Sequence, residues 1–180
     1  EGSDRFRSDR GGVAIIVKNC VVAAHVRSNV PEKMWCKISL FNTVYLLGVV
    51  YRLLATATDN VDKLNNFLCA HVNGNTRLIL TGHFNLPHIN WDAFFPGHVE
   101  IDSGEKMLEI MFAHNLTQIV REYTRMTSLS RSVLDLVFLS NKLCNYNICV
   151  DEGISDHRLV SVTIPLSVSR ARTYKTVQVK

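Results

Sequence analysis

The sequence predicts a mixed α/β or α+β fold in which helices pack outside two facing β-sheets. Short apolar runs with strand character outnumber helical patterns, and several neighbouring runs are separated only by short turns. The helices are predicted to occur singly between strands. The chain has 180 residues, of which 47% are hydrophobic and 20% charged, a composition typical of one globular domain with a packed core.

The first predicted elements are strands. Gly11-Gly12 suits a turn that leads into an apolar strand at 13–17. The alternating segment Trp35–Phe41 and the apolar run Val44–Tyr51 are predicted to be antiparallel neighbours, joined by a tight turn at Asn42-Thr43. The second run has no polar face, so its sheet is expected to be buried on at least one side.

Two helices are predicted from apolar residues at helical spacing. The first is capped by Asp59 or Asn60, continues to Val72, and ends at the turn 73–75. The second is capped near Ser103 and carries on one face Met107, Leu108, Met111 and Phe112.

Five further strands are predicted from short apolar runs bounded by turn residues. They lie at 77–82, 117–120, 134–139, 147–150 and 159–164.

The charge is mildly basic, with a net charge of +4 and a pI near 8.9. This is compatible with a polyanionic partner but does not establish one. The basic residues gather in 4–10 and 169–175, which we interpret as solvated tails; the alternative is a pair of nucleic-acid-binding arms.

The five cysteines include no C-x-x-C pair and most lie in apolar segments, which favours reduced core thiols in an intracellular protein over disulfides or a zinc site. No apolar run reaches the roughly 18 residues that span a bilayer, and the first residues do not resemble a signal peptide, so no membrane partner is predicted.

Polar side chains follow, interrupt or precede four of the predicted strands. Tyr51-Arg52 follow one strand, His83 and Asn85 another, Asp135 lies inside a third, and Ser155-Asp156-His157 precede the last. Singly, Asn85 fits a turn residue and Asp156 a loop residue that binds backbone N–H groups. A carboxylate inside an apolar strand is costly to bury alone, so Asp135 is predicted to have a partner.

Together these positions resemble the endonuclease/exonuclease/phosphatase family, the fold of pancreatic deoxyribonuclease and the apurinic/apyrimidinic endonucleases. The similarity is greatest to the endonuclease domain that non-LTR retrotransposons carry ahead of their reverse transcriptase. Five blocks follow that domain's order and approximate spacing: Gly11–Asn19, Leu47–Arg52, Gly82–Trp91, Ser132–Ser140 and Ser155–Val160. The resemblance implies a four-layer sandwich of the deoxyribonuclease type.

The resemblance also implies hydrolysis of a phosphodiester by in-line attack of water, with Mg²⁺, or Mn²⁺, on the phosphate. His157 matches the family's essential histidine, and Asp135 matches the carboxylate that orients it. Asp156 matches a metal-binding carboxylate, Asn85 the amide that holds phosphate and water, and Tyr51 a hydroxyl near the phosphate.

The implied partner is DNA, with Arg52 and Arg131 as contacts to its backbone. A reverse transcriptase domain is expected downstream in a full-length polyprotein, and a functional protein would need access to the nucleus.

The sequence departs from the family pattern in the G-D-x-N motif, because this chain has Gly82-His83-Phe84-Asn85. His83 therefore stands where a carboxylate activates or positions the attacking water. We interpret His83 as a substitution that removes or weakens activity; the alternative is an imidazole that serves as an adapted base. A zinc site made by His83 with His88 is disfavoured, because no Cys or carboxylate cluster accompanies the pair in the sequence.

The second departure concerns the metal. In the family an Asn and a metal-binding Glu precede the block at Gly11, and no residue of 1–10 matches them. We therefore expect an N-terminally truncated domain at 1–168 with its first strands missing and its core open on one side, followed by a basic tail or linker at 169–180, and a metal bound weakly if at all.

The leading hypothesis is a weakened or inactive DNA endonuclease domain of a non-LTR retrotransposon. The alternative is a non-catalytic nucleic-acid-binding or interaction module on the same fold. A small phosphoester as substrate ranks last, because the loop 86–91 resembles the retrotransposon domain more closely.

Overall fold

The computed structural model describes residues 2–3, 12–28, 32–40, 43–52, 59–98, 101–153 and 155–165. Several sequence predictions therefore lie outside the described residues: Gly11, Asn42, the capping side chain of Asp59, and the basic segments 4–10 and 169–175.

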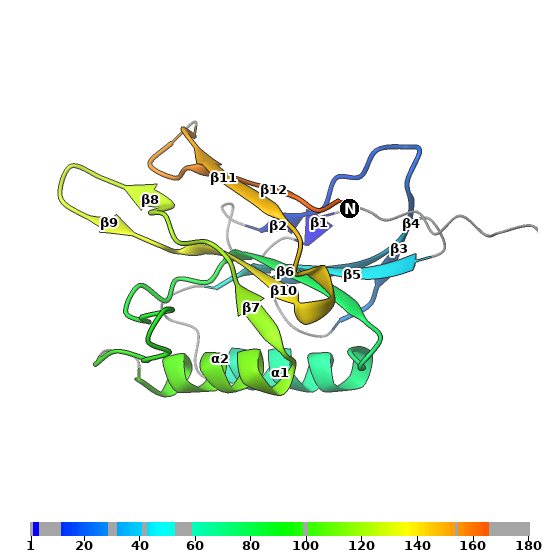
Figure 1. Cartoon of the computed structure of the whole chain (residues 1–180), viewed down its shortest axis with the longest axis horizontal. Coiled ribbons are helices and arrows are strands. Elements are labelled where there is room, and N and C mark those ends of the chain that lie inside the picture. The colour runs from blue at the N-terminus through cyan, green and yellow to red at the C-terminus, as the bar shows by residue number, and fades with distance from the viewer. Residues whose placement is uncertain are drawn as a thin grey trace, which may run out of the picture.

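A six-stranded mixed sheet forms the centre of the molecule (Figure 1). Only the pair β5–β6 is parallel, and the other neighbours are antiparallel. In spatial order the strands are β3 (Val22–Val26), β4 (Lys33–Leu40), β5 (Thr43–Tyr51), β6 (Arg77–His83), β10 (Asp135–Ser140) and β7 (Leu116–Gln118). The predicted antiparallel pairing of the segments around Trp35 and Leu47 is confirmed, because β4 pairs with β5 over its whole length.

Helices α1 (Asp59–His71) and α2 (Ile101–Ala113) lie together on one side of this sheet (Figure 1). Their apolar side chains pack with those of β4, β5, β6 and β10 in the larger hydrophobic core. At its centre Trp35 is fully buried and stacks on Phe67 of α1, with ring centroids 4.2 Å apart. Gly48 of β5 is the register partner of Trp35 in β4. A Cβ on Gly48 would come within 2.3 Å of the Trp35 ring, so the ring needs a glycine at this position.

The helix predictions are largely confirmed, with two differences. Ser103 is the third residue of α2 and not its cap; its hydroxyl accepts a hydrogen bond from Arg52. Phe112 was assigned to the buried face but is 58% exposed, and it contacts Phe94 instead of the core.

The opposite side of the sheet carries short two-stranded ribbons (Figure 1). They are β1 (Gly2–Ser3) with β2 (Val13–Ala14), and β11 (Asn147–Asp151) with β12 (Leu159–Thr163). A second apolar cluster lies here, in which Val150 of β11 is buried with Tyr45, Val137 and Leu139 of the large sheet. The strand predicted at 13–17 is thus shorter than expected.

The sequence did not predict four parts of the fold. They are β1, β3, the hairpin of β8 (Arg125–Met126) with β9 (Arg131–Ser132), and the short 3₁₀ helix η1 (Asn141–Leu143). The hairpin extends away from the large sheet (Figure 1), and Leu129 at its tip is 95% exposed. Among the described residues, neither α-helix combines the length and the apolar character needed to cross a bilayer.

Candidate active site at one edge of the large sheet

Three neighbouring strands bring their site residues to the same edge of the sheet. β5 ends at Tyr51 and β6 ends at His83, and these two residues are register partners in the parallel pair. β10 begins at Asp135, which is the antiparallel register partner of His83. Strand register alone therefore places Tyr51, His83 and Asp135 in one row.

A glycine allows β6 to reach this position. Gly82 has φ +131°, and a Cβ at that position would lie 2.0 Å from the carbonyl oxygen of Val50 in β5. A larger residue would be strained there and would collide with the neighbouring backbone. Gly82 is therefore required for the close approach of β5 and β6 immediately before His83.

His157 reaches the same place from outside the large sheet. The segment around it is held against β8 by an isolated bridge between Arg125 and His157. Two backbone hydrogen bonds flank this bridge: Met126 donates to the carbonyl of Asp156 at 2.9 Å, and Arg158 donates to the carbonyl of Thr124 at 2.7 Å.

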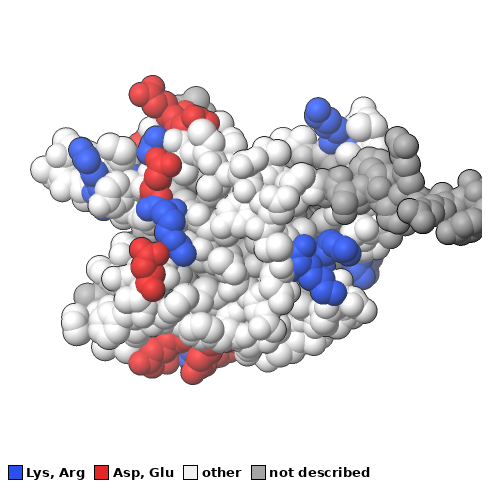
Figure 2. Space-filling view, in the orientation of Figure 1, with Lys and Arg blue, Asp and Glu red and all other residues white. Residues whose placement is uncertain are grey.

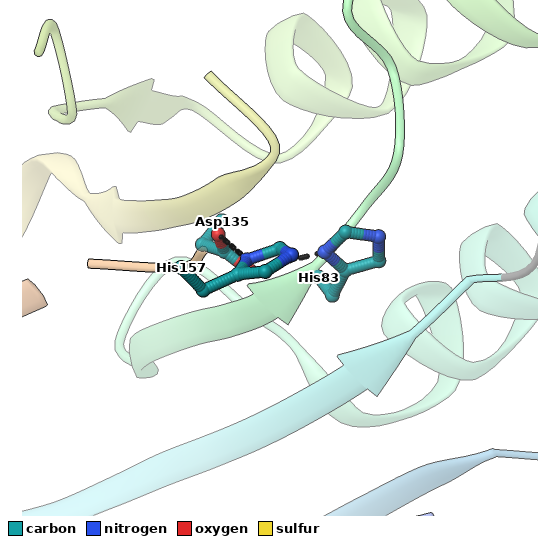
Figure 3. A group of neighbouring side chains, drawn as sticks. All are labelled: His83, Asp135 and His157. Atoms are coloured by element: carbon teal, nitrogen blue, oxygen red, sulfur yellow. Dashed lines mark hydrogen bonds and ion pairs between the residues drawn. The ribbon is translucent and has the colours of Figure 1, made fainter. Parts of the chain in front are cut away.

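Asp135 binds both histidines (Figure 3). Its Oδ2 lies 2.7 Å from Nδ1 of His157, and its Oδ1 lies 3.0 Å from Nδ1 of His83. The side chains of His83, Asp135 and His157 are 18%, 24% and 34% exposed, so the group is partly shielded but open to a ligand. The ring of Tyr51 stacks on that of His83, with centroids 5.5 Å apart.

The carboxylate of Asp135 is stabilised in its ionised form. Burial alone would raise the pKa of Asp135, but hydrogen bonds from His83, His157 and Thr124, with the charge of His157, hold that pKa below its ordinary value. An ionised carboxylate only accepts hydrogen bonds, so each ring donates from Nδ1 and the Nε2 atoms remain for a ligand.

Thr124 supports this carboxylate and was not identified from the sequence. It is fully buried, and its hydroxyl oxygen accepts the N–H groups of Leu134 at 3.0 Å and Asp135 at 2.9 Å. A threonine in a polar segment carries no pattern that would have marked it. Only the contact across the chain shows its role in fixing the start of β10.

Arg52 has a different role from the predicted one. It is 7% exposed, and its guanidinium donates to the carbonyl of Asn85 at 3.1 Å and to the hydroxyl of Ser103 at 3.1 Å. A guanidinium buried against protein groups is not available to a DNA phosphate, so we correct this assignment: Arg52 ties the loop after β6 to α2. Asn85 itself adopts φ 52°, and the predicted contact of its amide with phosphate stays a prediction.

Asp156 lies beside the three-residue group but faces another partner. Its carboxylate pairs with Arg125, with Oδ2 2.7 Å from Nε, and this hydrogen bond holds the pKa of Asp156 below its usual value. Both side chains are 43% exposed. Its predicted role as a metal ligand stays a prediction, as does the DNA contact of Arg131, which lies exposed on the β8–β9 hairpin.

The residues present do not fit Mg²⁺ well. This ion requires oxygen ligands in near-octahedral geometry. Within the described ranges, the residues whose ligand atoms gather closely enough for a metal are His83, Asp135 and His157, with one atom of each within 4.8 Å of the others. They offer two imidazoles and a single carboxylate, while Asp156 is engaged by Arg125.

Comparison with known proteins agrees with this fold. Residues 45–161 match the family model described as endonuclease-reverse transcriptase. No curated protein sequence matches the chain.

Solved structures share the fold at low sequence identity. The endonuclease domain of TRAS1, a telomere-specific non-LTR retrotransposon, is 12% identical with a TM-score of 0.65, covering 80% of this chain and 67% of that one. The 3′ phosphatase NExo from Neisseria, bound to a product DNA hairpin, is 17% identical with a TM-score of 0.54, covering 76% and 66%. An endonuclease/exonuclease/phosphatase family protein from Leptotrichia buccalis is 16% identical with a TM-score of 0.53, covering 81% and 60%.

Proposed function

Because the chain belongs to the endonuclease-reverse transcriptase family, we propose that its sheet-edge site binds a DNA phosphodiester and hydrolyses it slowly, as a weakened endonuclease domain of a non-LTR retrotransposon. The observation that carries this proposal is the 2.7 Å hydrogen bond between Asp135 and Nδ1 of His157, beside Tyr51 and His83. This pair gives the site a positioned imidazole whose Nε2 can face a phosphate.

The residues have distinct tasks in this proposal. Asp135 fixes the tautomer and orientation of His157, so that Nε2 of the ring can face a phosphate oxygen. Arg52 holds the carbonyl of Asn85, which keeps the loop after β6 in place. A divalent cation, when bound in this family, supplies further charge neutralisation on the phosphate.

The low activity follows from His83. In place of a carboxylate, the site has an imidazole whose Nδ1 is held by Asp135, so its basic atom differs from a carboxylate oxygen in position and in charge. Loss of a positioned acid or base typically costs about 10² to 10⁴-fold in rate.

Plasmid nicking in the presence of Mg²⁺ tests the proposal. We expect slow nicking by the wild type and an increase of about 10² to 10⁴-fold in His83→Asp, which restores the family's carboxylate. The matched control is His83→Asp combined with His157→Ala, which should lose the gain. The assay is run on residues 1–180 and on a version extended by the residues encoded upstream of Glu1. Absence of nicking by His83→Asp in both forms would contradict the proposed chemistry.

A non-catalytic DNA-binding module is the alternative that the same assay separates. Such a module binds through phosphate contacts and is strongly salt-dependent. On the face in Figure 2, acidic and basic side chains lie side by side on the left of the molecule, with a separate basic group to the right of centre. Salt-dependent DNA binding that Asp156→Ala leaves unchanged, without nicking by any variant, would favour this alternative.

A further inference from the structure

His83 stands where the family pattern has a carboxylate, and this difference changes which metal ion the sheet-edge site can hold. Two imidazoles and one carboxylate converge in His83, Asp135 and His157, with one ligand-capable atom of each within 4.8 Å of the others. Imidazole is a preferred ligand of Zn²⁺ and related transition metals, whereas Mg²⁺ prefers oxygen. We propose that these three residues form a binding site for a first-row transition metal, with Zn²⁺ as the ion it takes best.

The distances are close to those of a ligand set. Zn²⁺ lies about 2.0 to 2.2 Å from nitrogen and carboxylate ligands, which places two ligands of a tetrahedron about 3.3 Å apart. The Nδ1 atoms of His83 and His157 lie 3.0 Å and 2.7 Å from the oxygens of Asp135. An ion between the rings and the carboxylate would require these two separations to lengthen by a few tenths of an ångström and the two rings to turn toward the ion, with the ligand atoms of His83 and His157 lying within 4.8 Å of each other.

The proton balance is also favourable. Ligation through Nδ1 requires each neutral ring to carry its proton on Nε2, a tautomer shift without net loss of a proton. This arrangement needs both histidines and the carboxylate.

The open positions of the ion would face solvent. Three protein ligands leave room for water or a phosphate oxygen, as in catalytic zinc sites. The side chains are 18% to 34% exposed, so a small anion can reach the ion. The site differs from the sequence-based zinc hypothesis, because His88 is not part of the group and Asp135 and His157 are.

Calorimetric titration of the metal-free chain, without a polyhistidine tag, tests this proposal. Zn²⁺ is expected to bind with one high-affinity equivalent, and Mg²⁺ far more weakly. His83→Ala and His157→Ala should each weaken Zn²⁺ binding by at least about tenfold. His88→Ala is the matched control and should bind Zn²⁺ like the wild type. His83→Asn replaces His83→Ala if circular dichroism shows that the alanine variant is unfolded.

Substitution with Co²⁺ distinguishes this site from the cysteine thiols. These were predicted to lie in the core, but only Cys36 is buried, and the exposed ones include Cys69 and Cys149. Visible absorption of Co²⁺ bound by nitrogen and oxygen ligands, without a thiolate charge-transfer band, is expected in the wild type and should be lost in His83→Ala. Equal Zn²⁺ affinity in the wild type and His83→Ala, or a thiolate band, would overturn the proposal. The readouts are independent of DNA cleavage, so they do not depend on the nuclease proposal.

Discussion

Lys33 is a buried cation whose removal should stabilise the protein. It is the first residue of β4 and is 8% exposed, and its Nζ donates to the carbonyl of Asn60 in α1 at 2.9 Å. Burial lowers the pKa of Lys33 from 10.5 to about 8, against the opposing attraction of Glu32. Keeping Lys33 protonated in the folded protein therefore lowers the free energy of unfolding, because Lys33 is solvated by water in the unfolded chain.

The size and the pH range of this cost follow from the pKa change. The difference between 10.5 and about 8, at 1.36 kcal/mol for each pKa unit, corresponds to about 3 kcal/mol. Below pH 8 both states are protonated and the full cost is present. Between about pH 8 and 10.5 the unfolded chain binds more protons than the folded protein, so the contribution of Lys33 to stability rises with pH.

Lys33→Met keeps the length and apolar stem of the side chain and removes the charge. Allowing about 1 kcal/mol for the lost hydrogen bond, the free energy of unfolding should rise by about 2 kcal/mol at pH 7. Urea unfolding at pH 7, 9 and 10 measures this, and the gain over wild type should shrink as the pH rises. Lys37→Met, at an exposed position of the same strand, is the control and should change stability by less than about 0.5 kcal/mol at every pH. A destabilised Lys33→Met protein at pH 7, or a gain that is the same at pH 7 and 10, would refute this reasoning.

Three further predictions concern the sheet edge and the core. Gly82→Ala should lower the free energy of unfolding, measured by urea titration, by about 3 kcal/mol or more, because the added Cβ meets the Val50 carbonyl. Gly74→Ala is the control: a Cβ there meets no atom within 4 Å, so the free energy of unfolding should change by less than about 1 kcal/mol. Asp135→Asn should be less stable than wild type at pH 7 but should lose less stability on acidification. The pKa of Asp135 is lowered in the folded protein, so its contribution to stability is complete above pH 3.8 and is lost as the pH falls through the folded pKa. Equal acid sensitivity of the two proteins would contradict this. Leu136→Ala in the fully buried part of β10 should cost about 2 to 5 kcal/mol in thermal or urea unfolding, and Leu129→Ala at the exposed hairpin tip less than about 0.5 kcal/mol.

Much of the central sheet was predictable because its strands are short, apolar and bounded by turn residues. The pairing of β4 with β5 follows from alternation around Trp35 and the short turn after it. The hairpin β8–β9 was missed because the segment around Leu129 is polar, with no alternation to mark a strand. Local hydrogen bonds between Thr127 and Ser130 close its turn, and the bridge between Arg125 and His157 joins it to the segment of His157.

The site was predictable only in part, for a related reason. A carboxylate in an apolar strand indicates a partner, and the family resemblance named His157 as that partner for Asp135. The second bond, to His83, depends on the register between β6 and β10, which no local pattern encodes. Arg52 was misassigned because sequence does not tell a buried guanidinium from an exposed one.

The two histidines that donate hydrogen bonds to Asp135 are held in place by different parts of the structure. The hydrogen bond to His83 joins paired residues of adjacent strands in a six-stranded sheet. The one to His157 depends on a segment outside that sheet, which is held to the β8–β9 hairpin by the bridge between Arg125 and His157, the flanking backbone hydrogen bonds and the ion pair of Arg125 with Asp156. Small openings of that hairpin would release His157 while Asp135 and His83 stay together. Separation of His157 from Asp135 would therefore not require the large sheet to unfold.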